Sequence, residues 1–262
     1  MDRNRIVTAL VLAPIAVLIA LGASSGWIAL LYGILIILGA FEWSGFIQAS
    51  IVVRVLFAVL VMAAILVLWR YRPTAWMTLT HGIAIGWILV PILLIWRRTP
   101  INHFWTLTIG FVALIAAWCA LVALAGPFEA QDHLLLAFLL LVWGADSGAY
   151  IIGRTYGRHP LAPRISPHKT WEGLGGGALA VSLAILILWL FLGIDFWAGC
   201  FLGGVVFIFA IIGDLFESCF KRWGGLKDSG RLFPGHGGVL DRIDSWIAAA
   251  PVFLICSRWL FR

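Results

Sequence analysis

The segment from Asp214 to Asp244 concentrates charged side chains that could do chemistry. It holds ten of them within 31 positions, whereas the whole 262-residue chain has only 18 Lys and Arg and 12 Asp and Glu. They are Asp214, Glu217, Lys221, Arg222, Lys227, Asp228, Arg231, Asp241, Arg242 and Asp244. Because charges are costly in apolar surroundings, this concentration predicts a site for a multiply charged ligand.

Paired carboxylates mark both ends of this segment. Asp214 and Glu217 are three positions apart, and so are Asp241 and Asp244, which puts each pair on one face of a helix. Carboxylate oxygens suit hard cations, and phosphate oxygens of a ligand would complete the shell, so we expect Mg²⁺. The basic residues between the pairs could bind a triphosphate or a lipid phosphate, although topology also explains some of them.

A glycine-rich turn lies between the two carboxylate pairs. Gly235, Gly237 and Gly238 flank His236 and would let the backbone approach a ligand closely. The sequence leaves the role of His236 open, because a single histidine can act as a base or as a hydrogen-bonded structural group.

Two further polar clusters lie upstream. Asp146 stands among small residues in an apolar run, where a charge costs at least about 2.5 to 3.5 kcal/mol. We therefore expect Asp146 to be buried and to face a cavity, a cation or a counter-charge; an ion pair between packed helices is the alternative. Lys169 and Thr170 precede a helix start, where free backbone amides and a cation could bind phosphate. Alternatively, Lys169 is only a topology charge; in either case the glycines at 173–177 suit helix packing.

The composition identifies the elements that must position these clusters. Hydrophobic residues make up 63% of the chain, charged residues 11%, and the mean hydropathy is +1.04. These values indicate an all-α polytopic integral membrane protein, since continuous apolar runs of about 20 residues are typical of spanning helices and not of barrels. We place nine spans near residues 6–22, 26–46, 51–69, 75–96, 103–125, 133–152, 173–194, 196–216 and 244–261. The first could instead be a signal peptide.

The basic residues set the orientation. Sorting the 18 Lys and Arg residues onto alternate sides of the nine spans puts 14 on the side of the N-terminus. The positive-inside rule then predicts a cytoplasmic N-terminus, cytoplasmic positions for both long charged loops, and a C-terminus on the opposite side. The net charge of +6 therefore reports topology and anionic lipids, and we exclude nucleic acid as a partner.

The chain reads as one membrane domain over residues 1–262. Only four of its 12 acidic residues lie in the first 140 positions, and eight follow. We expect residues 1–130 to be helices that shape a lipid cavity and a scaffold. Residues 131–262 would be the catalytic half, in which the Asp146 and Lys169 clusters share one cytoplasmic site with the charged segment.

Six short motifs follow one another through this second half. They are D-S-G-A-Y at 146–150, S-P-x-K-T-x-E-G at 166–173, S-x-F-K-R at 218–222, K-D-S-G at 227–230, P-G-H-G-G at 234–238 and D-R-I-D at 241–244. Their combination and order resemble the signature of the bacterial-type phosphatidate cytidylyltransferases, the CDP-diacylglycerol synthases. The resemblance covers about residues 140–246, and the first five spans carry no matching motif.

The resemblance implies an all-helical, homodimeric enzyme of a bacterial inner (plasma) membrane. Such enzymes transfer the cytidylyl group of CTP to phosphatidate, giving CDP-diacylglycerol and pyrophosphate for phospholipid biosynthesis, and require Mg²⁺, with K⁺ as a further expected cation. Asp214 and Asp241 match the metal-binding acids. Catalytic roles would fall to Asp214, Lys221, Lys227, Asp228, His236, Asp241 and Arg242. Substrate binding would fall to Asp146, Ser166, Lys169, Thr170, Ser218, Arg222, Gly237, Gly238 and Asp244.

Phosphoryl chemistry indicates how these residues would work. A phosphate oxygen of phosphatidate would attack the α-phosphorus of CTP in line, and pyrophosphate would leave. Because this nucleophile is already anionic at neutral pH, positioning and charge neutralisation should dominate over general-base work. That weakens the case for His236 as a base.

Two other functions are weighed against this one. A CTP-dependent polyprenol or phytol kinase would transfer the γ-phosphate to a lipid alcohol, would release CDP and would depend more on a base. The combined motifs favour the cytidylyltransferase. An ion-coupled transporter could use a cation path through Glu42, Asp146, Asp214 and Glu217. Transporters carry polar groups through the depth of the membrane, however, whereas the polar residues here crowd at one end.

Overall fold

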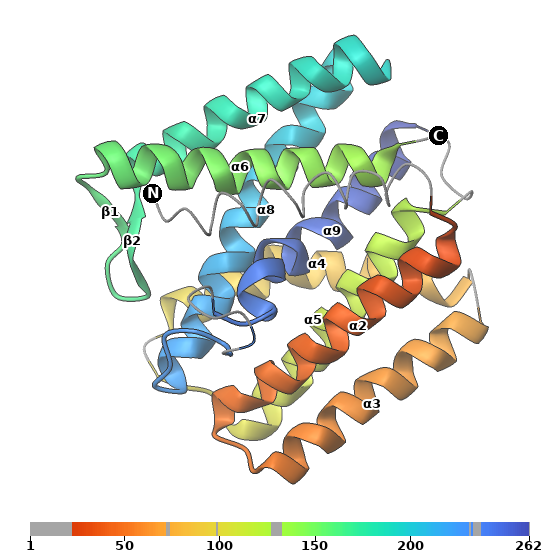
Figure 1. The fold of residues 1–262 in the computed structure, drawn as a ribbon, viewed down its shortest axis with the longest axis vertical. Helices are drawn as coiled ribbons and strands as arrows, with labels where there is room; N and C mark the ends of the chain where they lie inside the picture. Colours follow the sequence, from red (N-terminus) through yellow and green to blue (C-terminus); the bar gives the residue numbers. More distant parts are fainter. Residues whose placement is uncertain are drawn as a thin grey trace.

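The computed structural model describes residues 23–71, 74–97, 99–126, 133–230, 232 and 237–261. These residues form a bundle of α-helices with one short β-hairpin (Figure 1). The helices are α2 (Ser25–Trp43), α3 (Ile51–Arg70), α4 (Thr74–Trp96), α5 (His103–Leu124), α6 (Leu134–Tyr156), α7 (Trp171–Leu192), α8 (Phe196–Trp223) and α9 (Leu240–Leu260). The remaining elements are a 3₁₀ turn, η1 (Ser44–Ile47), and the antiparallel strands β1 (Pro160–Ala162) and β2 (Ser166–Thr170).

Seven helices within the described part of the chain are long and apolar enough to cross a membrane. They are α2 extended by η1, α3, α5, α6, α7, α8 and α9. This finding confirms the expected class, an all-α polytopic membrane protein. The span expected at 6–22 lies outside the described residues, and the count of nine stays a prediction.

The helix boundaries differ from the predicted ones mainly around the charged segment. α8 continues to Trp223 instead of ending at 216, and α9 begins at Leu240 instead of 244. Charged side chains do not end these helices. On α8, Glu217 and Lys221 pair one turn apart, and on α9, Asp241 lies in the first turn, where the helix dipole favours an acid. The polar loop expected before α7 contains the β1–β2 hairpin, which was not predicted.

Side-chain caps fix where the two helices after the hairpin begin. Thr170 Oγ1 accepts a hydrogen bond from the Gly173 N–H at 3.1 Å, and Asp195 Oδ1 accepts one from the Ala198 N–H at 2.9 Å. Gly193 ends α7 with a φ of +66°, a conformation that glycine adopts without strain. Helix α7 therefore starts directly at the end of β2.

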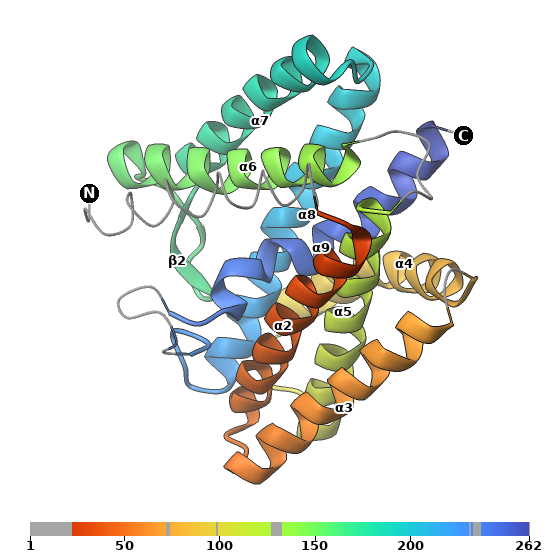
Figure 2. The ribbon, with the colours of Figure 1, turned by 45° about the vertical axis from the view of Figure 1, so that its right-hand side comes forward.

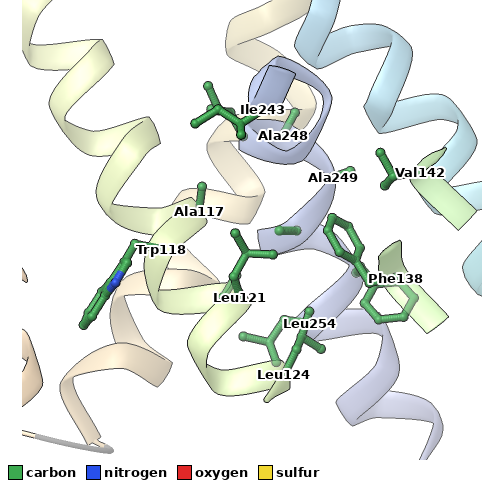
Figure 3. Close-up of a cluster of buried hydrophobic side chains, with 14 of the residues drawn as sticks. Ala117, Trp118, Leu121, Leu124, Phe138, Val142, Ile243, Ala248, Ala249 and Leu254 are labelled. Carbon is green, nitrogen blue, oxygen red and sulfur yellow. The ribbon is translucent and has the colours of Figure 1, made fainter. Parts of the chain in front are cut away.

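Helices α5 and α9 form the centre of the bundle. Helix α9 contacts α2, α4, α5, α6 and α8, and its middle, residues 248–254, is buried throughout. Figure 3 shows Leu121 and Leu124 of α5 and Phe138 of α6 beside α9 in this core. The outer sides of α3 and α7 leave many large apolar side chains exposed, as contact with lipid requires. The acids at the start of α9 are therefore carried by a central helix.

Helices α6 and α7 lie side by side in both Figure 1 and Figure 2, and glycines allow their backbones to touch. A Cβ on Gly148 would overlap the carbonyl oxygen of Gly176, and one on Gly177 would lie 3.0 Å from that of Ala145. These contacts confirm the packing face predicted at 173–177, since small residues let membrane helices approach closely.

Two adjacent glycines test this packing. Gly176→Ala should lower the stability by about 1–3 kcal/mol, because the new Cβ would lie 2.6 Å from the Gly148 carbonyl oxygen and against Ile152. Gly175→Ala is the matched control, since nothing lies within 4 Å of its Cβ and alanine is the better helix former. Thermal unfolding of the purified proteins in detergent compares them, and equal melting temperatures would contradict this account.

Candidate functional site

Helices α8 and α9 approach closely enough to bring the two predicted carboxylate pairs together. A Cβ on Gly213 would lie 2.5 Å from the carbonyl oxygen of Asp244, so only glycine allows this distance. Asp214 and Glu217 follow this contact on α8, while Asp241 and Asp244 occupy the first two turns of α9. The site is built at a crossing of two helices.

Lys221 joins these two helices. Its side chain is buried, and Nζ lies 2.5 Å from Glu217 Oε2 and 2.7 Å from Asp241 Oδ1. Glu217 is fully buried, and its other oxygen, Oε1, has no hydrogen-bond partner among the described residues. Because both carboxylates share one ammonium group, this geometry favours a Lys221 that holds the site together over one that contacts phosphate freely.

The second oxygen of Asp241 organises the connection between α8 and α9. Asp241 Oδ2 accepts hydrogen bonds from the Ser229 N–H at 3.0 Å, the Ser229 hydroxyl at 2.9 Å and the Gly238 N–H at 2.7 Å. Gly237 has a φ of +82°, and a Cβ there would overlap Oδ2. The sequence predicts that Gly237 and Gly238 let the backbone approach a ligand. In the structure they instead contact the Asp241 carboxylate of the protein itself.

Lys169 brings the β-hairpin into the site. Its Nζ lies 2.5 Å from Asp214 Oδ2, and the two side chains stay partly exposed, at 22% and 30%. The Ser218 hydroxyl donates to Asp214 Oδ1 at 3.3 Å, and Arg222 Nε donates to the Ile165 carbonyl at 3.0 Å. Figure 2 shows β2 descending from α6 toward α8, in line with these contacts. The structure therefore brings the upstream Lys169 cluster into contact with the charged segment.

Asp146 of α6 joins the site through Ser245. The Ser245 hydroxyl lies 3.1 Å from both carboxylate oxygens of Asp146, and the Ser245 N–H donates to Asp244 Oδ1 at 2.8 Å. Lys169 and Arg242 are close enough to attract Asp146 electrostatically. Asp146 thus faces a hydrogen-bond donor and two basic groups, as the sequence predicts for an acid in an apolar helix, while part of its surface stays accessible beside α9.

The site holds more carboxyl groups than basic groups. The interacting groups are the carboxylates of Asp146, Asp214, Glu217, Asp241 and Asp244 and the basic groups of Lys169, Lys221 and Arg242. No three His, Cys, Asp or Glu side chains in the described part of the chain are arranged to hold a metal ion by themselves. Mg²⁺ usually takes only one or two carboxylates and completes its shell with water and substrate phosphates, so Asp214 and Asp241 stay the predicted ligands. The excess of carboxylates and the unpartnered Glu217 oxygen both suit a cation.

The other predicted residues lie farther from this centre or outside the described residues. Lys227 and Asp228 are exposed on the connection after α8, where a ligand could reach them. Ser166 lies in β2, at the base of the strand that carries Lys169. His236 lies outside the described residues, so both readings of its role stay predictions.

Glu42 of α2 belongs to this site, although the sequence gives it a role only in the transporter alternative. It is 6% exposed and accepts hydrogen bonds from the Ser229 hydroxyl at 3.0 Å, the Val239 N–H at 3.0 Å and the Leu240 N–H at 2.8 Å. One signal was available, since Glu42 is the only acid in the span expected at 26–46. Its partners could not be predicted, because two of the three are backbone groups almost 200 positions away.

Comparison with known proteins identifies the class to which this membrane fold and site belong. Residues 3–260 match the model of the cytidylyltransferase family. The match spans nearly the whole chain, and the chain therefore belongs to the cytidylyltransferase family.

Individual relatives narrow this class. The chain is 41% identical over 263 residues to the phosphatidate cytidylyltransferase of Pseudomonas aeruginosa, covering 97% of this chain and 96% of that protein. It is 33% identical over 282 residues to the one of Haemophilus influenzae, covering 97% of each. A phosphatidate cytidylyltransferase of Staphylococcus epidermidis is 47% identical over 129 residues, about half of each chain. These findings confirm the resemblance that the motifs indicate.

Removing the Lys221 charge should destabilise the protein. In Lys221→Met, Glu217 and Asp241 would lose their shared counter-ion, and breaking a buried ion pair typically costs about 3–5 kcal/mol. Lys227→Met is the matched control, because Lys227 is exposed and its loss should cost less than about 0.5 kcal/mol. Melting temperatures in detergent measure both, and a Lys221→Met protein as stable as the control would show that this lysine does not hold α8 to α9.

Proposed function

We propose that this protein transfers the cytidylyl group of CTP to phosphatidate, which gives CDP-diacylglycerol and pyrophosphate for phospholipid biosynthesis. Membership of the cytidylyltransferase family and nearly full-length similarity to phosphatidate cytidylyltransferases support this function. The single structural observation that carries it is the meeting of Lys169 and Asp214 beside the pair of Lys221 and Asp241. Anion-binding and cation-binding groups lie together there, as a reaction between two phosphate compounds requires.

The reaction joins a phosphate oxygen of phosphatidate to the α-phosphorus of CTP. The bond from that phosphorus to the oxygen bridging to the β-phosphate breaks, and pyrophosphate leaves. Because the attacking oxygen is already anionic at neutral pH, the site must chiefly bring two anions together and stabilise their charge. Lys169 is partly exposed and would bind a phosphate, with the exposed Lys227 as a second cation. Lys221 would act through the position it gives to Asp241.

Asp214 and Asp241 would hold Mg²⁺. The bound ion would neutralise charge on the phosphates of CTP. Lys169 and Lys221 each pair with one of these carboxylates and so keep the two side chains oriented at the helix crossing. An accompanying K⁺ and a homodimer stay predictions.

We also propose that the site faces the cytoplasm of a bacterial cell and that the protein lies in its inner membrane. The seven apolar helices and the bacterial relatives support a multi-pass membrane protein. The distribution of Lys and Arg favours a cytoplasmic N-terminus and nine spans. In this orientation the acyl chains of phosphatidate remain in the bilayer, while its headgroup meets CTP at the boundary.

The two alternative functions have less support. The nearly full-length relatives are named as phosphatidate cytidylyltransferases, which argues against a CTP-dependent lipid kinase. A transporter would place polar groups along the depth of the bundle. Most acids of this site instead gather at the adjoining ends of α8 and α9.

One assay tests the proposed function. Purified protein in detergent, supplied with labelled CTP, phosphatidate and Mg²⁺, should form CDP-diacylglycerol and pyrophosphate in equal amounts. Asp214→Ala and Asp241→Ala should each lower turnover about 100-fold or more, because each removes a charged group from the place where charge must be stabilised. Formation of CDP and a phosphorylated alcohol, or turnover without added lipid, would overturn the proposal.

Asp195→Asn is the matched control for these variants. Asp195 caps the opposite end of α8, and asparagine caps helices about equally well, so turnover should stay at the wild-type level. Titration with Mn²⁺, followed by electron paramagnetic resonance, measures metal binding apart from activity. Wild-type metal affinity in Asp241→Ala would contradict the metal assignment.

Single cysteines test the orientation in a protein whose native cysteines are replaced. Arg164→Cys lies between β1 and β2, and Asp195→Cys lies between α7 and α8, so α7 separates the two positions. A membrane-impermeant maleimide should label Asp195→Cys in intact cells and Arg164→Cys only in inside-out vesicles. The reverse pattern would place the site outside the cytoplasm.

A further inference from the structure

We infer that Glu42 is a positioning residue of this active site, although it lies in the half of the chain to which no chemistry is assigned. Its carboxylate binds both sides of the connection between α8 and α9, and it shares the Ser229 hydroxyl with Asp241. The effect of Glu42 on activity rests on the proposed function, whereas its effect on the connection does not.

Both carboxylate oxygens of Glu42 are used. Oε1 accepts from the Val239 N–H at 3.0 Å, and Oε2 accepts from the Leu240 N–H at 2.8 Å and the Ser229 hydroxyl at 3.0 Å. Ser229 lies on the α8 side of the connection, while Val239 and Leu240 lie on the α9 side. One side chain therefore fixes the two sides relative to each other.

The backbone of the connection lies directly on the end of α2. A Cβ on Gly230 or Gly238 would overlap the carboxylate oxygens of Glu42, and one on Gly224 would overlap the Phe46 carbonyl oxygen in η1. Figure 2 shows this part of the chain beside the end of α2. Glycines at these positions thus allow a contact that any side chain would prevent.

The residue after Glu42 holds α2 in place. The Trp43 ring stacks on Phe216 with centroids 5.8 Å apart and lies 4.8 Å from the ring of Phe220, both on α8. Its indole N–H donates to the Thr106 carbonyl of α5 at 2.9 Å. Glu42 is therefore carried on a support that is packed against two other helices.

The Ser229 hydroxyl links Glu42 to the predicted metal ligand. Its oxygen lies 3.0 Å from Glu42 Oε2 and 2.9 Å from Asp241 Oδ2. A hydroxyl has one hydrogen to donate, so two carboxylates draw on a single donor. A change at Glu42 must therefore alter the hydrogen bonding of Asp241.

Glu42→Gln in the full-length protein tests the inference. Glutamine has the same shape, but its NH₂ group would face a backbone N–H, and a buried donor would lose its acceptor. Hydrogen exchange in peptides covering 226–230 and 237–240 should become about tenfold faster or more, whereas exchange in 113–124 of α5 should stay unchanged. The kcat/KM for CTP should fall about tenfold or more.

Ser44→Ala is the matched control. Ser44 is also buried, two positions away, but its hydroxyl donates to the Phe41 carbonyl within the same part of the chain. Exchange at 226–230 and 237–240 and the kcat/KM should stay at wild-type values. Combining Glu42→Gln with Ser229→Ala should reduce kcat/KM by less than the product of the two single effects, because both act through one hydroxyl.

Three results would overturn the inference. They are unchanged exchange at both sides of the connection, faster exchange throughout the chain including α5, and local loosening with wild-type kcat/KM. The first would remove the anchoring role, the second would make Glu42 a support of the whole fold, and the third would separate it from the active site. Should the wild-type protein not form CDP-diacylglycerol, the exchange measurements would still decide whether Glu42 fixes the connection, so the two failures are distinguishable.

Discussion

The buried ammonium group of Lys221 is the interaction on which the rest of the site depends. It lies between Glu217 on its own helix and Asp241 on the next, and such charges are tolerated away from water only when they are paired. Helices α8 and α9 must therefore cross closely, which Gly213 permits. The positions of Asp214 and Asp244 follow from that crossing, because each lies within one turn of it.

Around this pair, Asp214, Asp146 and Glu42 each accept a donor from another part of the chain. Lys169 of β2 pairs with Asp214, Ser245 of α9 bonds to Asp146 of α6, and Ser229 bonds to Glu42 of α2. The two halves of the chain therefore meet at this site. The N-terminal helices reach the centre of the site directly, through one acid that binds backbone amides.

The sequence predicts the class of fold and most of the site, because both depend on local patterns. The apolar runs locate most spanning helices to within a few residues. The charged motifs contain Lys169, Asp214, Lys221 and Asp241, but the sequence does not show that Lys169 pairs with Asp214 and Lys221 with Asp241. The helix ends predicted near 216 and 244 are wrong because Glu217 and Lys221 pair one turn apart on α8 and because the helix dipole favours Asp241 in the first turn of α9. Glu42 was missed because two of its partners are backbone amides almost 200 positions away.

The contact of Lys169 with Asp214 gives the site an internal counter-ion before any ligand arrives. A nucleotide that arrives with a divalent cation would bring phosphates that can pair with Lys169 and a cation that can pair with Asp214. Binding would then be an exchange of partners in which the cation offsets part of the added negative charge, rather than the addition of an anion to a bare cation. At the boundary of a membrane, where an uncompensated charge is costly, such an exchange would lower the electrostatic cost of loading the site.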